Sequence, residues 1–312
     1  MGVNLTSPAN PAEPVSPAAK PEARNPGPSW GYRFISALDT LLPEWIFQPM
    51  RRMGTWAALP VMPVQREHSR AYLKVLLGRE PTRRELFAHF FAAMEFLILR
   101  LRVARGLPHR GELAPDASGF RELMGTGEAA LLGTFHFGHS DLTGYLVGRQ
   151  EGRRVFMVRQ RVGNSHDTDV LATQFGEWVT FIWVNDPDNL LFALKDAVAA
   201  GGSVALQCDR YEFTAKTEAF QFLGARRIFP FTIYHLALIF RLPVVLSVGV
   251  PAGPGKSTVY SSPLFRPDQG GKAANLARAH AHFQDFLTRI EGWLRADPTL
   301  WFNFRPLNPP AP

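Results

Sequence analysis

The sequence has little cysteine and no long apolar run. A single cysteine, Cys208, among 312 residues excludes an intramolecular disulfide framework and a thiolate-rich zinc site, and it fits a reducing compartment. The two longest apolar stretches are interrupted, at 87–99 by Glu95 and at 229–240 by His235. The first residues also lack the basic segment and apolar run of a secretory signal. We therefore expect neither export nor a membrane span, whereas a position on a membrane surface is allowed.

Clusters of lysine and arginine interleaved with aromatic residues are also missing. The 34 basic and 27 acidic residues are spread along the chain and give a net charge of +7. This balance favours anionic partners such as a membrane surface or an acidic carrier protein, and it argues against nucleic acid. What the chain does have is phenylalanine: 24 residues, against six tyrosines, enough to line an apolar groove as well as a core.

The composition changes along the chain and divides it into four parts. Residues 1–29 are proline, alanine and polar residues, which predicts a disordered tail. Residues 30–110 show helical patterns, and these amphipathic helices either associate with a membrane or cap the core. Residues 111–305 form the expected α/β catalytic domain, and 306–312 a second tail. Within the helical part, Thr82 and Glu85 have the spacing of a capping box before a helix that ends at Gly106.

After residue 125 short apolar segments alternate with helical patterns. The clearest helices are one that starts at Pro187, with Asp186 as its cap, and a last amphipathic helix over about 274–295. Alternation of this kind predicts an α/β fold with a mainly parallel sheet flanked by helices, preceded by the N-terminal helical region. The expected strands are 128–135, 153–158, 179–184, 203–207 and 243–250.

Two histidines and an aspartate follow the first of these strands, in the sequence HFGHSD. Ligands collect at the carboxyl ends of parallel strands, which is where His136 is expected. On a helix, five residues would separate His136 and Asp141 by roughly 140°, so the two can meet only if the chain turns between them. Gly138 allows such a turn. An aspartate bonded to one imidazole nitrogen would leave the other nitrogen as a base for a substrate hydroxyl or amine, without a protein nucleophile.

This motif and four later blocks resemble the glycerolipid acyltransferase superfamily. Within it the chain is similar to the lipid A late acyltransferases (lauroyl and myristoyl transferases), as a divergent member. The resemblance covers roughly residues 30–305, with the blocks in the family's order. Two departures concern an N-terminal anchoring helix, which is missing or replaced here, and RRIFPF, which stands where relatives have proline and glycine. The matching blocks are HFGHSD, VFMVRQRVGN, GGSVALQCDRYEF, the segment AFQFLGARRIFPF with the helix and strand after it, and DPTLWFNF.

The resemblance implies acyl transfer from an acyl carrier protein or acyl-CoA thioester to a hydroxyl or amine of a lipid acceptor. His136 would be the general base and Asp141 would orient it, with no cofactor and no metal. The enzyme would be peripheral, on the cytoplasmic face of the inner membrane, against an anionic lipid surface. Backbone amides after residue 138 or a nearby arginine would stabilise the oxyanion. The implied substrate-binding residues are Arg159, Asn164, Asp209, Arg210, Phe222, Gly224 and Arg226.

Three other interpretations of the same residues stay open at this point. A metal-dependent hydrolase would use His136, His139 and Asp141 as ligands, with help from NSHDTD, residues 164–169. A catalytically inactive relative would bind membrane or carrier without chemistry, although such a protein would be expected to lose the His–Asp pair. Cys208 could be a thiol nucleophile, but its place at the end of an apolar strand beside an acidic residue predicts a buried, inert thiol.

Overall fold

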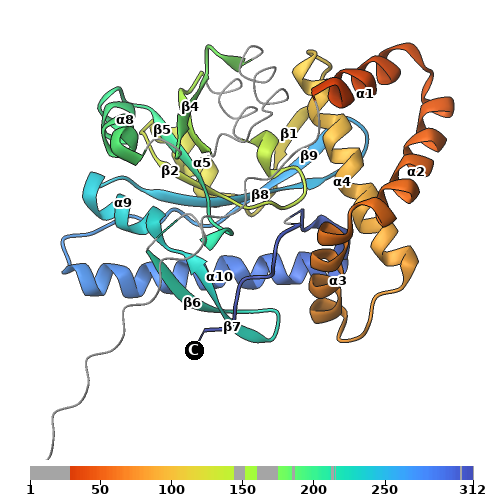
Figure 1. Ribbon diagram of the computed structural model, residues 1–312. Coiled ribbons are helices and arrows are strands. Elements are labelled where there is room, and N and C mark those ends of the chain that lie inside the picture. The colour runs from red at the N-terminus through yellow and green to blue at the C-terminus, as the bar shows by residue number, and fades with distance from the viewer. Residues whose placement is uncertain are drawn as a thin grey trace, which may run out of the picture.

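A seven-stranded sheet forms the centre of the computed structural model (Figure 1). The structure describes residues 29–143, 152–159, 175–184, 187–211, 214, 216–302 and 304–311. The strand order is β1-β9-β8-β2-β5-β3-β4, and every neighbouring pair is parallel except β8 and β9. The predicted α/β class with a mainly parallel sheet is therefore confirmed. The strands are β1 (Arg110–Leu113), β2 (Leu131–Thr134), β3 (Val155–Arg159), β4 (Val179–Trp183), β5 (Ser203–Gln207), β8 (Val244–Pro251) and β9 (Lys256–Ser261).

Both faces of this sheet are covered, which explains why its central strand reads as an uninterrupted apolar run. Leu131 of β2 packs into the cluster formed with α8 (Pro187–Ala199), α9 (Thr232–Phe240) and α10 (Lys272–Ala296). Its neighbour Leu132 points to the opposite face, into the cluster that includes α5 (Ser118–Thr126). Successive side chains of a strand alternate between faces, so a strand with helices on both sides must be apolar throughout.

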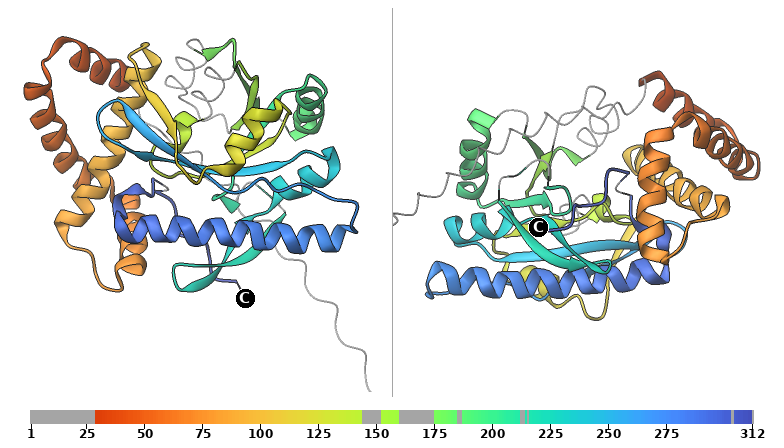
Figure 2. Two further views of the ribbon diagram at one scale, coloured as in Figure 1. Left: turned by 180° about the vertical axis from the view of Figure 1, so that it is seen from behind. Right: turned by 60° about the horizontal axis from the view of Figure 1, so that its bottom comes forward.

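Four helices stand at one side of the sheet in Figures 1 and 2: α1 (Ser29–Leu41), α2 (Glu44–Val61), α3 (Pro63–Leu77) and α4 (Arg83–Ala104). The capping box predicted at the start of α4 is present, because Thr82 accepts from the Glu85 amide and the Glu85 carboxylate accepts from the Thr82 amide. Ion pairs join α1 and α2 to α4. Among the described residues, no helix is long and apolar enough to cross a membrane.

The exposed surface of α1 and α2 carries large apolar side chains. Trp45 is 75% exposed and Met53 71% exposed, although each lies on a helix whose opposite face is packed against α4. Such a row is larger than the scattered exposed apolar residues of an ordinary surface. Five further large apolar side chains of these two helices are also exposed, and together with Trp45 and Met53 they are called the apolar row below: Trp30, Phe34, Leu41, Trp56 and Val61.

A β-hairpin and the C-terminal segment complete the fold. Strands β6 (Thr217–Phe222) and β7 (Ala225–Pro230) pair in an antiparallel way and pack on α10. Residues 304–311, most of which the sequence assigned to a tail, lie along β7: the Ile228 amide donates to Pro309 and the Ala311 amide donates to Arg226. Asn308 is buried there. The outer edge of β7 offers backbone groups that need partners, and this segment supplies them.

Candidate active site

Two adjacent parallel strands end together and bring His136 to Asp209. Strands β2 and β5 are in register up to Thr134 and Gln207, and the Cys208 amide continues the ladder by donating to Thr134 at 2.7 Å. Two residues beyond the last ladder pair, His136 and Asp209 therefore leave the sheet side by side at its carboxyl edge. The pairing is a consequence of strand register, because the two residues are 73 positions apart in the chain.

The Asp209 carboxylate holds His136 at two points. The Nδ1 nitrogen of His136 lies 2.9 Å from Oδ1 of Asp209, and the His136 backbone amide donates to Oδ2 at 2.9 Å. Asp209 is completely buried, and the side chain of His136 is 12% exposed. A carboxylate can only accept, so the ring proton belongs on Nδ1 and the lone pair of Nε2 is available to a substrate.

Electrostatics keep His136 neutral and Asp209 ionised. Burial lowers the pKa of His136, and the positive charge of Arg210 lowers it further, so the attraction of Asp209 is outweighed. Burial raises the pKa of Asp209, but the attraction of His136 and its hydrogen bonds lower it by more. A neutral imidazole beside an ionised carboxylate is the protonation state that a general base requires at neutral pH.

Asp141 does not orient His136, contrary to the sequence-based prediction. Its carboxylate lies 3.3 Å from Arg159 and 3.6 Å from Arg100, and it accepts from the Gln207 amide group at 3.2 Å. Burial raises the pKa of Asp141, and the two arginines lower it by more. The difference arises because β5 ends directly beside His136 and delivers Asp209 to its ring, whereas the turn after Gly138 directs Asp141 towards the two arginines. Asp141 acts on His136 through its charge alone.

The turn that separates the two residues depends on Gly138, as the sequence predicts. Gly138 has a φ of +47°, and a Cβ added there would lie 2.4 Å from the Gly249 carbonyl oxygen. The amides of the turn already have acceptors: Gly138 donates to Leu300, His139 to Gly249 and Ser140 to Phe137. These three amides are therefore not available to an oxyanion, whereas the arginines of the site remain candidates.

The segment around Trp301 fixes the other side of the motif. The Phe302 amide donates to the His136 carbonyl at 2.7 Å, and Phe137 and Trp301 form an isolated antiparallel bridge. The carbonyl of Trp301 is in turn 2.6 Å from Nε2 of His89, whose Nδ1 contacts the Ser69 hydroxyl at 2.7 Å. His89 thus connects α3 and α4 to the strand-like segment that supports His136.

His139 has a different environment from His136. Its Nδ1 lies 2.7 Å from the Ser257 hydroxyl, which also contacts Nε2 of His109 at 2.7 Å. Burial and then the nearby His109 lower the pKa of His139 to about 4. Within the described part of the chain, no cluster of three histidine, cysteine, aspartate or glutamate side chains could hold a metal ion. The further metal candidates His166, Asp167 and Asp169 lie outside the described residues.

Cys208 is a buried thiol of the core. It is 2% exposed and packs with the cluster beneath β2. Burial raises the pKa of Cys208, and the adjacent charge of Asp209 raises it further. The thiolate is the nucleophilic form, so this cysteine is unsuited to attack a substrate, as the sequence predicts.

The remaining predicted substrate-binding residues are divided between two places. Arg159, at the end of β3, and Arg210, directly after Asp209, belong to the site by their effects on Asp141 and His136. Asn164 lies outside the described residues. Phe222, Gly224 and Arg226 belong to the tip of the β6–β7 hairpin, and among the described residues none of their hydrogen bonds or ring contacts reaches His136.

The hairpin tip has structural contacts. The ring of Phe222 is 1% exposed and packs against Trp301 at 5.6 Å between centroids. Gly224 and the preceding Leu223 both have positive φ angles, and the Leu223 amide donates to Glu291 of α10. The carbonyl of Arg226 accepts from Ala311. These contacts explain the aromatic and glycine positions by packing and by the turn.

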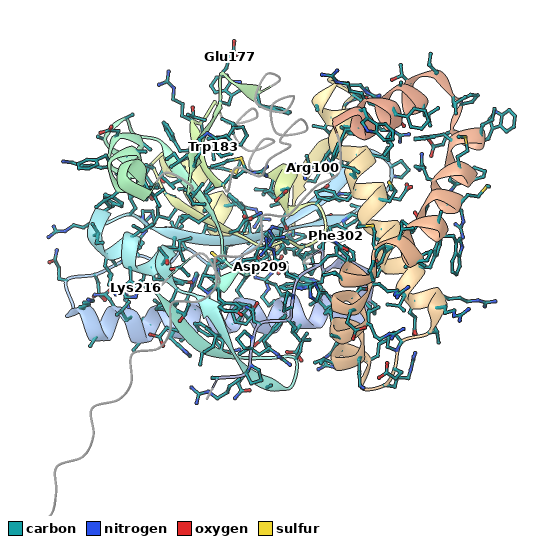
Figure 3. The ribbon with its side chains drawn as sticks, viewed as in Figure 1. Arg100, Glu177, Trp183, Asp209, Lys216 and Phe302 are labelled. Atoms are coloured by element: carbon teal, nitrogen blue, oxygen red, sulfur yellow. The ribbon has the colours of Figure 1, made fainter. Side chains whose placement is uncertain are left out.

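Sequence reasoning missed Arg100 and Phe96, both on α4. Arg100 reaches Asp141, and the ring of Phe96 stacks on His139 at 5.4 Å and on Phe302 at 5.3 Å. Figure 3 shows Arg100, Asp209 and Phe302 around the centre of the molecule, contributed by α4, the end of β5 and the C-terminal segment. The only available signal was their spacing of four residues, which places them on one face of a helix.

Comparison with known proteins finds similarity to solved structures. No family model matches the chain, and no curated protein matches it. Among solved structures, the chain is similar to the 1-acyl-sn-glycerophosphate (LPA) acyltransferase PlsC from Thermotoga maritima, with 12% identity and a TM-score of 0.38, over 80% of this chain and 98% of that chain. A likeness at this level does not transfer the neighbour's activity, so function has to be argued from the residues of the site.

Proposed function

We propose that this protein is an acyltransferase of the glycerolipid acyltransferase superfamily, a divergent relative of the lipid A late acyltransferases. It transfers a fatty acyl group from an acyl carrier protein or acyl-CoA thioester to a hydroxyl or amine of a lipid acceptor. The observation that carries the proposal is the bond between Nδ1 of His136 and the buried Asp209, at the carboxyl edge of a parallel sheet. The pair leaves Nε2 of His136 free to act as a base. His136 is also the histidine of HFGHSD, the motif through which the chain resembles the superfamily.

The proposed reaction needs no nucleophile from the protein. Nε2 of His136 accepts the proton of the acceptor's hydroxyl group. The hydroxyl oxygen at the same time attacks the carbonyl carbon of the thioester. The tetrahedral intermediate then collapses, the carbon–sulfur bond breaks, and the imidazolium returns the proton to the leaving thiolate. Asp209 stays ionised and stabilises the imidazolium. Neighbouring hydroxyls are engaged elsewhere, since Ser140 contacts Phe137 and Gly249, and Ser257 contacts two histidines.

Three arginines give this site its charge. Arg100 and Arg159 lie beside the Asp141 carboxylate, and Arg210 also lowers its pKa through its positive charge. We assign the arginines to the phosphates of the donor's phosphopantetheine arm or of the acceptor, and to the developing oxyanion, because guanidinium groups bind such oxygens in pairs.

The exposed apolar side chains of α1 and α2 support a position of the enzyme at a lipid surface. Tryptophan and methionine side chains such as Trp45 and Met53 would enter the interfacial region of a bilayer, and the exposed basic residues Arg33 and Arg52 would meet anionic headgroups. We propose a peripheral position on the cytoplasmic face of the inner membrane. The apolar row supports this proposal, since a helical cap on the core would bury these side chains.

The test is transfer of a labelled acyl group into a total bacterial lipid extract. Acyl carrier protein and acyl-CoA are supplied in turn as donors, and the labelled product is identified by mass spectrometry. Wild-type protein is compared with His136→Ala, which removes the base and is expected to lower the rate by about 10²–10⁴. Equal transfer by the variant, with an unchanged circular dichroism spectrum, would refute the proposed role of His136. Absence of transfer from both donors with wild-type protein would refute acyl transfer and leave the inactive-relative interpretation.

A further inference from the structure

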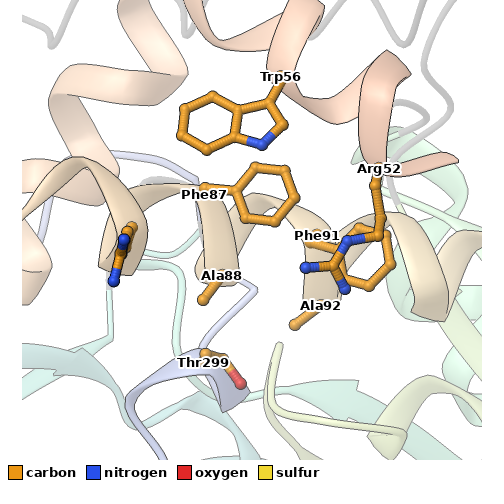
Figure 4. A pocket seen from close by; sticks show the side chains of 8 residues that line it. Arg52, Trp56, Phe87, Ala88, Phe91, Ala92 and Thr299 are labelled. Carbon is orange, nitrogen blue, oxygen red and sulfur yellow. The ribbon is translucent and has the colours of Figure 1, made fainter. Parts of the chain in front are cut away.

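A groove lies between α2 and α4, outside the proposed catalytic centre. It has a volume of about 570 Å³ and is closed on one side by Thr299 of the short 3-10 helix η2 (Pro298–Leu300). This volume is within the roughly 300–1,000 Å³ typical of ligand pockets. Figure 4 shows Ala88 and Ala92 of α4 on the side towards Thr299, with Trp56 of α2 on the opposite side.

Stacked aromatic rings form one wall of this groove. Trp56 stacks on Phe87 with 4.6 Å between ring centroids and 16° between planes, and Phe87 stacks on Phe91 at 5.6 Å and 11°. Trp56 is nevertheless 46% exposed. Ala88 and Ala92 of α4 lie beside this row of rings, and their small side chains leave an apolar channel with space for a narrow chain.

Two arginines give the groove a positive rim. The guanidinium group of Arg52 lies over Phe91 at 5.4 Å and over Phe87 at 5.7 Å, and Arg84 also lines the groove. Arg51 and Arg102 on the same two helices are paired with carboxylates. Across the described ranges, by contrast, no carboxylate lies within 4.0 Å of Arg52 or Arg84. Their charge therefore complements an anionic ligand.

The groove is connected to the catalytic centre along two elements. Ala88, Ala92, Phe96 and Arg100 are spaced by four residues, each turned by roughly 40° from the one before, and they lead along α4 from the groove to the His136 site. The first two line the groove, Phe96 stacks on His139, and Arg100 reaches Asp141. On the other wall, Thr299 lies three residues before Phe302. The amide of Phe302 donates to the carbonyl of His136.

The other side of the groove opens at the exposed apolar row. Trp56 belongs both to the groove and to the surface that carries Trp45 and Met53. A ligand that reaches the groove from a membrane surface therefore meets the aromatic wall first. An apolar chain with an anionic head satisfies both the rings and the guanidinium groups.

We propose that this groove binds an anionic single-chain phospholipid from the membrane surface, with its chain on Trp56, Phe87 and Phe91 and its phosphate on Arg52 and Arg84. This binding does not depend on the proposed reaction, because none of these side chains belongs to the His136 site.

Calorimetric titration with octyl phosphate below its micellar concentration tests this site. Octyl glucoside is the neutral ligand with the same chain, and inorganic phosphate is the headgroup without a chain. We expect saturable binding of octyl phosphate that both control ligands fail to match. The double variant Arg52→Gln, Arg84→Gln should weaken binding by about three- to tenfold, as expected for the loss of exposed charged hydrogen bonds.

A second variant fills the groove without changing its charge. Ala92→Phe places a ring in the channel and should abolish binding, while Ala277→Phe, on the exposed side of α10, is the matched control and should bind as wild type does. Thermal unfolding and circular dichroism verify that both variants are folded. Binding of octyl glucoside as tight as that of octyl phosphate, or unchanged binding by Ala92→Phe, would overturn the proposal.

The two proposals fail in different experiments. His136→Ala should bind octyl phosphate normally while transfer is lost. If wild-type protein transfers no acyl group but the groove variants behave as expected, the lipid site stands and the proposed reaction is wrong. If transfer proceeds and the groove variants bind octyl phosphate as wild type does, the reaction stands and the lipid site is wrong.

Discussion

Replacement of Asp209 by asparagine is expected to remove the catalytic base while His136 stays in place. The Asp209 carboxylate accepts both the His136 backbone amide and its ring Nδ1–H, each at 2.9 Å. An asparagine has only one accepting oxygen, and the backbone amide is a donor that cannot change. The amide NH₂ group of the variant would therefore face Nδ1, which moves the ring proton to Nε2.

The expected loss can be estimated from this change of tautomer. A protonated Nε2 cannot accept the proton of the acceptor, so kcat should fall by about 10²–10⁴, the usual contribution of a general base. Loss of a charge-assisted hydrogen bond in a buried position should also lower the free energy of unfolding by about 1.5–3 kcal/mol. The protein stays folded at room temperature if its stability is typical of a domain of this size.

The assay is single-turnover transfer from the donor identified above, with Asp141→Asn as the matched control. Asp141→Asn leaves the bond between His136 and Asp209 intact, so we expect a smaller loss of kcat and a larger effect on KM, because Arg100 and Arg159 lose the carboxylate between them. Nitrogen NMR of the imidazole reports the tautomer directly. A rate for Asp209→Asn within tenfold of wild type, or a more severe loss for Asp141→Asn, would refute the assignment of Asp209 as the orienting group.

Four further predictions follow from other parts of the molecule. The kcat/KM should be lost on acidification with a midpoint below pH 6.5, since the active neutral form of His136 has a lowered pKa; a midpoint above 6.5 in a pH–rate profile would contradict this. Burial lowers the pKa of His89 from 6.5 to about 4, so the unfolded state takes up the proton first, and this residue should lower the free energy of unfolding by about 1.6 kcal/mol between pH 6.5 and 5. In urea unfolding, His89→Gln should reduce the loss between these pH values by that amount without abolishing it, because His139 also has a lowered pKa; an unchanged pH dependence would contradict this. Gly138→Ala should cost about 2–4 kcal/mol and Gly125→Ala, with open space around it, almost nothing in the same assay. Binding to anionic vesicles should weaken as salt rises and should weaken further in Trp45→Ser, Met53→Ser; salt-independent sedimentation with vesicles would argue against the basic contacts.

Local patterns in the sequence were sufficient for the elements that carry strong local signals. The capping box at Thr82 and Glu85, the helix near 274–295 and the five apolar strand segments all correspond to observed elements. Strands β1, β9, β6 and β7 were missed because their burial alternates or because their partners are distant in the chain. Strict alternation of apolar and polar residues would have indicated a half-buried strand, but these segments do not alternate strictly in sequence.

What the sequence determined by itself is the chemistry at the end of β2: an apolar strand, a histidine, a glycine that permits the turn, and an aspartate. What only the tertiary structure decided is which carboxylate serves the histidine. Sequence proximity favoured Asp141, five residues away, but strand register brings Asp209 to Nδ1 and turns Asp141 towards Arg100 and Arg159. Pairing between parallel strands is set by backbone hydrogen bonds between segments distant in the chain, and spacing within one segment cannot reveal it.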